Sequence, residues 1–521
     1  MIRIPERYTG EVMKLERTKN TIRNASFGMI NKVLSILFLF LIRMVLIRTL
    51  SEEYLGLNSL FSSILSVLNL AELGLGGAIV FSMYQPIAED DQKTVNALLL
   101  FYRKVYYRIG GIVLTVGLLL VPFLPELIKE GIPEDLHLTF VYLVFLSNTV
   151  LSYFLQAHYI GLLYAYQRED LISRVNIMVM LLVHSLQIIL LLTVRNYYLH
   201  IILLPVSTVI TNLWVAHVAK KKFPECRPSG VLAREQMLVI REKVGGLFLN
   251  KISMSSRNAF DSIFLSMFLG LSMTARYNNY FYVVWAISCF TNVLTGAVTA
   301  GAANSVSLES VEKNYDDMKR MNFVYMWLAG WCSICLLCMI QPFMALWVGS
   351  RMMLPMEAVI MFCMYFYIMK MGDVKEVYVQ AKGIWWEKRF QAIAEVAANL
   401  VLNYLLGKHF GIYGIIGATL LSLLFLNFGY GAHLIFKHYF KHRSVTEYFR
   451  RNMVYALATA VAAALTYAVC RYLPFGIGGI ALRLAVCLVL PNIFFWLLYR
   501  KTVIFSQTKP WVCTKLRKLL H

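Results

Sequence analysis

Charged residues are scarce in this chain, and among them the acidic residues are fewer than the basic ones. Only 15% of the 521 residues are charged, whereas 59% are hydrophobic. The composition therefore excludes a soluble globular protein and indicates an integral membrane protein. Lys and Arg number 50 against 29 Asp and Glu, but they lie in short gaps between apolar runs. That distribution is typical of membrane topology signals and not of a nucleic-acid-binding face.

The first 23 residues lack the apolar core and the small-residue cleavage site of a signal peptide. We therefore expect the first apolar run to be retained in the protein. Met13 is an alternative start of translation, and N-terminal sequencing that finds residues 1–12 would exclude it.

Cysteine is also infrequent, and the nine cysteines show no paired spacing that predicts disulfides in outer loops. Cys332, Cys335 and Cys338 form a CxxCxxC pattern, but the pattern lies inside an apolar run and no loop supplies further ligands. We interpret these cysteines as small residues that pack between helices, and we expect neither a metal nor a cofactor.

Long apolar runs are abundant, and runs of roughly 20 such residues predict transmembrane helices. The chain is thus predicted to be an all-α polytopic membrane protein with about fourteen transmembrane helices. Their approximate spans are 24–48, 55–83, 105–125, 136–163, 173–194, 199–219, 244–269, 276–304, 322–347, 355–381, 390–407, 411–436, 452–472 and 479–499. With both termini in the cytoplasm, the inner loops and tails hold thirty-six Lys and Arg and the outer loops hold seven, as the positive-inside rule requires.

Two pairs of short segments indicate an internal repeat. Asn31-Lys32 in the first span recurs as Asn250-Lys251 in the seventh, and residues 69–82 resemble residues 292–305 in their small residues. Because six helices separate the copies, the halves are expected to be parallel repeats about an axis along the membrane normal.

Four cations lie in the spans that open the two halves. Lys32 and Arg43 are eleven residues apart, so they share one helix face at a separation of roughly 16 Å along the axis. Lys251 and Arg257 occupy the seventh span. Buried cations are costly in lipid, so we interpret them as lining a wet path for an anion. Lys32 and Lys251 lie close enough to the inner helix ends to extend into the interface instead.

Polar and acidic side chains mark further helix faces in the second, seventh and eighth spans. Asn, Ser and Thr in such positions also serve as hydrogen-bonding glue between helices, which is the alternative to a cavity lining. Acids in the membrane are candidates for coupling to H⁺ or Na⁺, or they neutralise nearby cations. The candidate cavity residues are Asn58, Asn69, Asn278, Trp285 and Asn292, and the candidate coupling residues are Glu72 and Asp261.

The most distinctive sequence segments lie in residues 14–110, among them KLERTKNTIRNASFGMINKV and RTLSEEYLGLNSLFSSILSVLNLAELGLGGAIVFSMYQPIAEDD. This region resembles the opening of bacterial Wzx-type polysaccharide flippases, in the multidrug/oligosaccharidyl-lipid/polysaccharide exporter superfamily. The later chain agrees in helix count and loop pattern.

The resemblance implies two six-helix lobes around a central cavity, plus two C-terminal helices. The expected parts are the tail 1–23, the N-lobe 24–219, a basic linker 220–243, the C-lobe 244–436, two additional helices within 437–500, and a basic tail 501–521. The resemblance further implies alternating access that moves undecaprenyl-diphosphate-linked oligosaccharides to the outer leaflet of the plasma membrane. In relatives, cationic residues on the opening helices of the lobes engage the diphosphate, and the resemblance makes Lys32, Arg43, Lys251 and Arg257 the candidates for that role here. Polysaccharide polymerases and glycosyltransferases are then candidate partners.

Two other functions are alternatives to the flippase hypothesis. A drug or metabolite cation antiporter would share the fold but use acidic residues in its cavity. A membrane-embedded polysaccharide polymerase or glycosyltransferase would need an extramembrane loop with catalytic acids, and no loop here carries a convincing pair. We therefore expect the chain not to be an enzyme, and the sequence does not identify the glycan.

Overall fold

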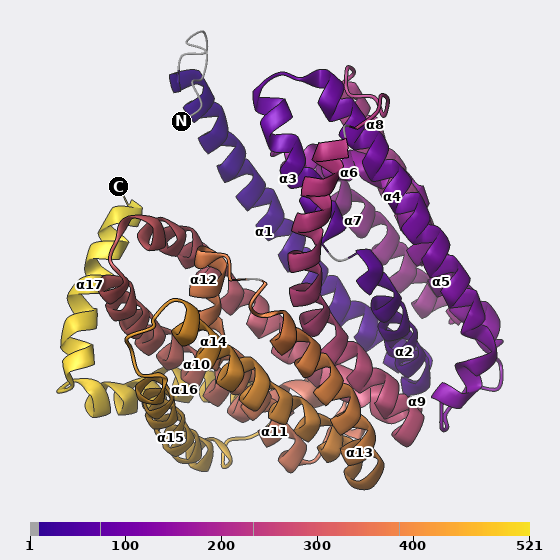
Figure 1. Cartoon of the computed structure of the whole chain (residues 1–521). Helices are drawn as coiled ribbons and strands as arrows, with labels where there is room; N and C mark the ends of the chain where they lie inside the picture. Colours follow the sequence, from indigo (N-terminus) through magenta and orange to yellow (C-terminus); the bar gives the residue numbers. More distant parts are fainter. Residues whose placement is uncertain (1–9, 73, 233, 385, 521) are drawn as a thin grey trace. The chain divides into compact units, whose positions relative to one another are not determined.

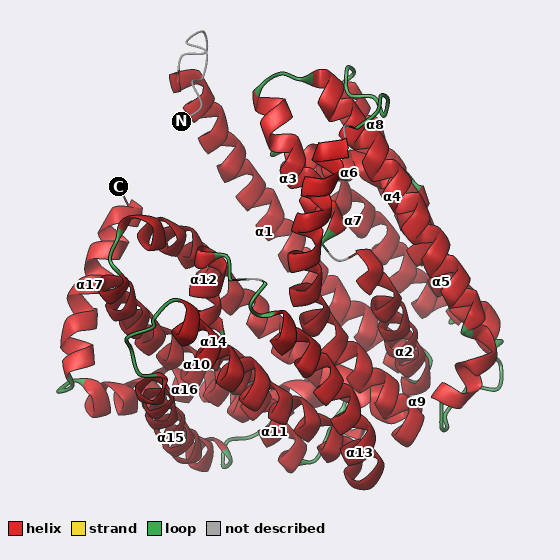
Figure 2. Ribbon diagram, viewed as in Figure 1, coloured by secondary structure: helices red, strands yellow, loops and turns green. Residues whose placement is uncertain are grey.

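The computed structural model describes residues 10–72, 74–232, 234–384 and 386–520. These residues form helices joined by short loops, and no strand occurs among them (Figures 1 and 2). A helix satisfies its own backbone hydrogen bonds, which is what a chain surrounded by lipid requires. The predicted all-α fold is confirmed.

The chain divides into two compact units, Met1–Ala259 and Phe260–His521, and each is described by itself. The helices of the first unit are α1 (Gly10–Thr49), α2 (Glu52–Leu68), η1 (Asn69–Glu72), α3 (Leu75–Ala88), α4 (Gln92–Leu119), η2 (Val121–Leu127), α5 (Leu138–Phe154), α6 (Ala157–Ala165), α7 (Glu169–Thr193) and α8 (Tyr197–Lys222). Helix α9 (Arg234–Leu308) continues from the first unit into the second and is broken at Gly270.

The second unit contains the rest of α9 and the C-terminal half of the chain. Its helices are α10 (Val311–Trp347), η3 (Ser350–Met352), α11 (Met356–Met371), α12 (Asp373–Lys382), α13 (Arg389–Leu421), η4 (Ser422–Tyr430), α14 (Gly431–His438), α15 (Val445–Cys470), α16 (Ile477–Tyr499) and α17 (Val503–Leu520). The η4 segment is a π-helix, an irregularity that is frequent at functional sites.

In the first unit, α1 packs along α7, and α8 packs against both α5 and α7. Helices α3, α4 and α6 form a neighbouring group. The interior between α2 and α5 is aromatic: Phe61 contacts Tyr142 edge to face, at 5.4 Å between ring centroids. The Tyr142 hydroxyl donates to the Gly117 carbonyl, so its polar end is satisfied inside the unit.

In the second unit, α10 is the central helix and contacts α11, α15 and α16. Gly330 brings α10 close to the last two helices. A Cβ at this position would lie 2.6 Å from Thr459 Oγ1 on α15 and 3.3 Å from the Phe495 ring on α16. Close approach at small residues is how membrane helices gain packing energy without a hydrophobic driving force.

The fourteen predicted spans coincide with single helices or with consecutive helical pieces, and several of them are bent or divided in the structure. The span 105–125 bends by 60° between α4 and η2, and the span 355–381 is divided into α11 and α12. The span 55–83 is divided into α2, η1 and α3, with Gly74 at a φ of 94° before α3. The span 136–163 bends by 52° between α5 and α6, where Gln156 has a φ of 58°. Hydropathy does not reveal such breaks, because the apolar run continues through them.

Seven helices of the described chain are long and apolar enough to cross a membrane, or up to nine if each bent pair counts as one span. One of the seven runs over Arg389–His438 and contains two of the predicted spans. The remaining predicted spans lie in the broken α2–α3 segment, in α9 and in α11–α12.

Candidate functional site

The opening helix places its two predicted cations in different surroundings. Arg43 is buried, with 5% of its surface exposed, whereas the Lys32 side chain is exposed. Both lie in the apolar stretch Asn20–Thr49. An arginine inside such a helix needs polar or charged surroundings, because transfer of a guanidinium into hydrocarbon is costly.

The two predicted cavity asparagines of the second span hold helices together. The Tyr197 hydroxyl of α8 donates to Asn58 Oδ1 at 2.5 Å, and the Tyr153 hydroxyl of α5 donates to Asn69 Oδ1 at 2.8 Å. These bonds are of the interhelical kind that competes with a ligand-binding role. Asn69 nevertheless begins η1, the short helix that carries Glu72.

Glu72 opens into a pocket of about 670 Å³ within the first unit. Five tyrosines from four helices line the pocket, and the Tyr106 hydroxyl donates to Glu72 Oε1. Tyr102 stacks on Tyr106 with ring centroids 4.4 Å apart. The lining residues are Glu72, Gly74, Gly76, Gly77, Val80, Phe81, Tyr84, Tyr102, Tyr106, Ser152, Tyr153, Ala157, Ile160, Tyr164 and Asn212.

Two glycines make room for these rings. A Cβ on Gly76 would lie 2.5 Å from the Tyr106 hydroxyl, and a Cβ on Gly161 would lie 2.7 Å from the Tyr102 ring. Neither Lys nor Arg is among the described residues that line the pocket. The pocket therefore combines one carboxylate with aromatic faces, hydroxyls and an amide, a lining that suits a sugar ring or an organic cation.

The second unit holds a buried carboxylate, Asp261, with 2% of its surface exposed. Asn403 donates to Oδ1 at 2.7 Å, Tyr277 donates to Oδ2 at 2.7 Å, and the Thr419 hydroxyl lies 3.0 Å from Oδ2. Asn399 donates to Thr419 Oγ1 at 3.1 Å and completes the cluster. Each of these side chains is buried, so the carboxylate is held in one position by groups on α9 and α13.

The other predicted residues of the seventh and eighth spans are divided between packing and charge contacts. Asn278 donates to Ser262 Oγ at 3.1 Å and to the Thr274 carbonyl at 2.9 Å, and Trp285 is half-buried. Arg257 is buried at 8% exposure. The Lys251 side chain lies outside the described part of the structure.

Asn292 belongs to a charged group that the sequence did not single out as a site. Lys370 Nζ lies 2.8 Å from Asn292 Oδ1 and 3.0 Å from Asp373 Oδ2, and the Tyr325 hydroxyl also donates to Asp373. Lys370 is 1% exposed. A lysine that only marks the end of a helix extends its ammonium group into the interface and does not require such burial.

A second buried lysine lies one turn further along. Lys375 is 1% exposed, with Nζ 3.9 Å from Glu376 Oε2, and Lys388 Nζ lies 2.6 Å from the same oxygen. Gly431 gives it space, since a Cβ there would lie 2.8 Å from Lys375 Nζ. The tyrosines around Glu72 were also missed, although Tyr102 and Tyr106 are four residues apart and therefore share a helix face.

No protein-family model matches the chain, and no curated protein matches it. Several solved structures align with it. Lipid II flippase MurJ, in an inward closed conformation, aligns with a TM-score of 0.64 at 13% identity, over 92% of this chain and 100% of that one. A multidrug resistance transporter of the MATE family, in an inward-facing conformation, aligns at 0.58 and 14% identity, over 80% and 98%.

A third structure is a MOP superfamily transporter from Pyrococcus furiosus, described as having a binding pocket of reverse polarity. It aligns with a TM-score of 0.52 at 13% identity, over 80% of this chain and 95% of that one. These proteins are named as a flippase and transporters. The chain therefore has the fold of the multidrug/oligosaccharidyl-lipid/polysaccharide superfamily, as its resemblance to Wzx-type flippases implied.

Proposed function

We propose that the protein is a flippase that moves undecaprenyl-diphosphate-linked oligosaccharides from the inner to the outer leaflet of the plasma membrane by alternating access. The observation that carries the proposal is the buried Arg43 in the apolar opening helix of a chain with this fold. A diphosphate is a compact anion, and a guanidinium in a poorly screened cavity binds it with paired hydrogen bonds. MurJ, which shares the fold, is named as a flippase of lipid II.

In this scheme the cations act at different stages. Lys32 and Lys251 capture the diphosphate near the cytoplasmic side, Arg257 holds it in the cavity, and Arg43 serves the outward-facing stage. Lys32 suits capture because its side chain is exposed. The lysine ammonium is a compact charge on a flexible side chain, whereas the Arg43 guanidinium is planar and offers paired N–H donors.

The glycan is proposed to enter the Glu72 pocket. Sugars bind through aromatic faces for their C–H surfaces and through carboxylates and amides for their hydroxyls. The Tyr84 and Tyr164 side chains line the pocket together with Asn212, and its volume of about 670 Å³ accommodates a sugar ring. Asn278, Asn292 and the half-buried Trp285, in the second unit, are proposed as further contacts of the glycan.

Ion coupling is assigned to Asp261. The carboxylate is buried and accepts hydrogen bonds from amide and hydroxyl groups, so a Na⁺ ion or a proton that binds to it must displace at least one of these donors. Glu72 is the candidate coupling acid of the first unit. Transport itself needs no organic cofactor.

The test is export by the double variant Arg43→Ala, Arg257→Ala in a strain that depends on this protein for its surface glycan. We expect export to be abolished and the lipid-linked oligosaccharide to accumulate on the inner leaflet. Arg48→Ala is the matched control, because Arg48 lies on the same helix with an exposed side chain. Membrane insertion is checked by quantitative immunoblot, and full export by the inserted double variant would refute the proposal.

The Glu72 pocket also favours a second function, antiport of cationic drugs or metabolites. Its carboxylate and tyrosine rings resemble an aromatic cage for an organic cation, and no Lys or Arg is among the described residues that line it. Efflux of a cationic dye from cells separates the two functions. Dye efflux that is lost in Glu72→Gln, together with normal glycan export in the double arginine variant, would favour the antiporter.

A further inference from the structure

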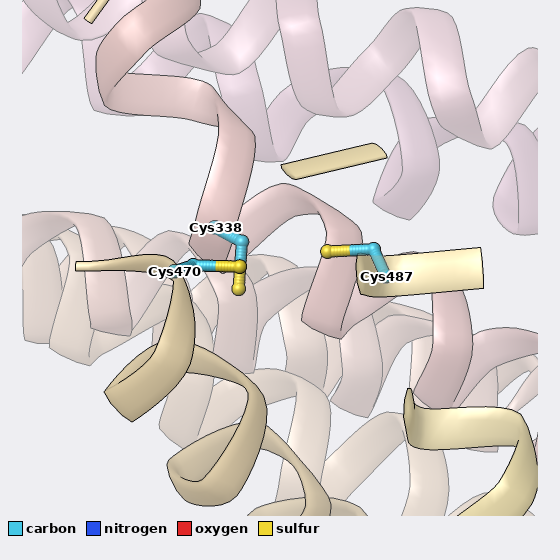
Figure 3. A group of neighbouring side chains, drawn as sticks. All are labelled: Cys338, Cys470 and Cys487. Carbon is cyan, nitrogen blue, oxygen red and sulfur yellow. The ribbon is translucent and has the colours of Figure 1, made fainter. Parts of the chain in front are cut away.

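Three cysteines from distant parts of the sequence meet inside the second unit. Cys338 of α10, Cys470 of α15 and Cys487 of α16 turn their sulfur atoms toward one another (Figure 3). The three Sγ atoms lie within 4.8 Å of each other, and all three residues are buried, at 3%, 1% and 0% exposure. Sequence spacing does not predict this group, because Cys470 and Cys487 lie on helices remote from the CxxCxxC pattern.

Each cysteine lies at a helix end or at a turn where a proline removes one backbone hydrogen bond. Pro342 and Pro491 follow Cys338 and Cys487 by four residues, and a proline cannot donate to the carbonyl four positions earlier. The Cys487 carbonyl instead accepts from Trp331 Nε1 at 2.9 Å. Cys470 is the last residue of α15. Helix interruptions of this kind allow local adjustment of the backbone.

The spacing of the sulfur atoms is close to that of a thiolate metal site. With a Zn–S bond of about 2.3 Å, the sulfur atoms of a tetrahedral site lie about 3.8 Å apart. The observed upper limit of 4.8 Å exceeds that value by about 1 Å, a distance that rotation about the Cα–Cβ bonds can remove. Thiolate ligands select zinc and cuprous copper over harder ions.

A buried arginine beside the cysteines favours a divalent over a monovalent metal ion. Arg483 is 4% exposed and lines a cavity of about 100 Å³ together with Cys338 and Cys470. It donates to the carbonyls of Pro474 and Leu473, and within the described residues no carboxylate forms an ion pair with it. Three thiolates and a divalent ion carry one negative charge, which Arg483 neutralises. A monovalent ion would leave a net negative charge in a medium where charge is costly.

We propose that Cys338, Cys470 and Cys487 bind one Zn²⁺ ion as a structural clamp that fastens α15 and α16 to α10. Water from the adjoining cavity supplies the fourth ligand, since a volume of about 100 Å³ holds water readily. The clamp is independent of the transported substrate. It would stabilise the association of the last two helices with the rest of the second unit.

The test uses the purified full-length protein in detergent, with thiols kept reduced. Co²⁺ serves as the spectroscopic probe, and Zn²⁺ affinity is measured by competition with a chromophoric chelator. We expect one Co²⁺ per chain with thiolate charge-transfer bands that Zn²⁺ abolishes. Cys338→Ser, Cys470→Ser and Cys487→Ser should each weaken Zn²⁺ binding at least 100-fold. Cys332→Ser is the matched control, because Cys332 is a buried cysteine of the same helix outside the group.

If the variants do not give monodisperse protein, alkylation of the wild type replaces them. Zn²⁺ should then protect the three cysteines selectively, as read by mass spectrometry of their peptides. The proposal is overturned if the protein binds no Zn²⁺, if it binds only cuprous ion, if two of the three cysteines are found as a disulfide in freshly purified protein, or if binding survives all three substitutions.

Discussion

Asp261 is fixed by donors on both of its oxygens, so its charge cannot be replaced by an amide without penalty. In Asp261→Asn, one oxygen becomes an NH₂ group that faces Asn403, Thr419 or Tyr277, all of which donate in the present structure. A buried group that loses its partner costs about 1–3 kcal/mol. We expect the variant to unfold at a lower temperature in detergent.

Asp316→Asn is the control for this change. Asp316 forms a surface pair with Lys319, and its side chain is 48% exposed. Such pairs contribute at most about 1 kcal/mol. Equal melting temperatures for Asp261→Asn and the wild type would show that the hydrogen bonds to Asp261 contribute little to stability.

Gly76 and Gly77 are neighbours on α3 with opposite surroundings. Alanine at Gly76 would place its Cβ 2.5 Å from the Tyr106 hydroxyl and 3.0 Å from that of Tyr102, whereas a Cβ on Gly77 meets nothing within 4 Å. The tyrosines cannot give way freely, because Tyr106 is bonded to Glu72 and stacked on Tyr102. We expect Gly76→Ala to cost about 1–3 kcal/mol and to reduce export.

Gly77→Ala should be neutral or slightly stabilising, since alanine favours a helix by about 1 kcal/mol over glycine. Fluorescence-detected size-exclusion after heating measures both variants. The pocket geometry would be contradicted if the two substitutions had the same effect.

Individual site residues were accessible from the sequence when they carried charge in an apolar run. Arg43, Arg257 and Asp261 were selected on that ground, and the structure buries all three. The tyrosines around Glu72 were not selected, because a tyrosine in a membrane span is compatible with lipid, packing or a pocket. Only the tertiary structure brings Tyr102, Tyr106 and Tyr153 together.

At the scale of elements, the break in α13 shows what a hydropathy profile leaves out. Gly411 has a φ of 56° and a ψ of −132°, a conformation that other residues avoid, and it separates two of the predicted spans. The prediction located the boundary there but gave no reason for it. The glycine provides the reason, because it allows the chain to turn within a continuous apolar sequence.

Gly411→Ala is therefore expected to cost about 1–3 kcal/mol. Gly417→Ala, six residues further along in regular helix, meets only the Met361 methyl carbon at 3.8 Å and should cost nothing. Thermal unfolding of both variants in detergent checks this. A smaller loss for Gly411→Ala than for Gly417→Ala would contradict the strained turn.

The breaks in the second and fourth predicted spans also occur at residues with positive φ, and a hydropathy profile does not reveal them either. Gly74 and Gln156 both adopt positive φ, yet glycine and glutamine occur elsewhere in regular helices. The helix positions followed from apolar length, whereas the interruptions depend on neighbours. For the span 55–83, the interruption is what directs Glu72 into the pocket.

At the scale of the whole molecule, the distribution of Lys and Arg predicts one topology with both termini in the cytoplasm. The loop between η2 and α5 should then face outward, and the loop after α8 should face inward. Reporter fusions after Glu130 and after Arg227 test the orientation of these two loops. Phosphatase activity is expected only at the first and cytoplasmic fluorescence only at the second. The reverse pattern would mean that a span before α5 has been miscounted.

The buried lysines of α11 and α12 have a consequence for biogenesis. A segment with Lys370, Asp373, Lys375 and Glu376 partitions poorly into lipid, because each charge at mid-membrane opposes insertion. The Asn292 partner of Lys370 has already been synthesised at that moment, but Lys388, which shares Glu376 with Lys375, has not. We therefore expect the insertion machinery to shelter this segment until the first turn of α13 leaves the ribosome, so that neighbouring segments of the second unit enter the bilayer as a group.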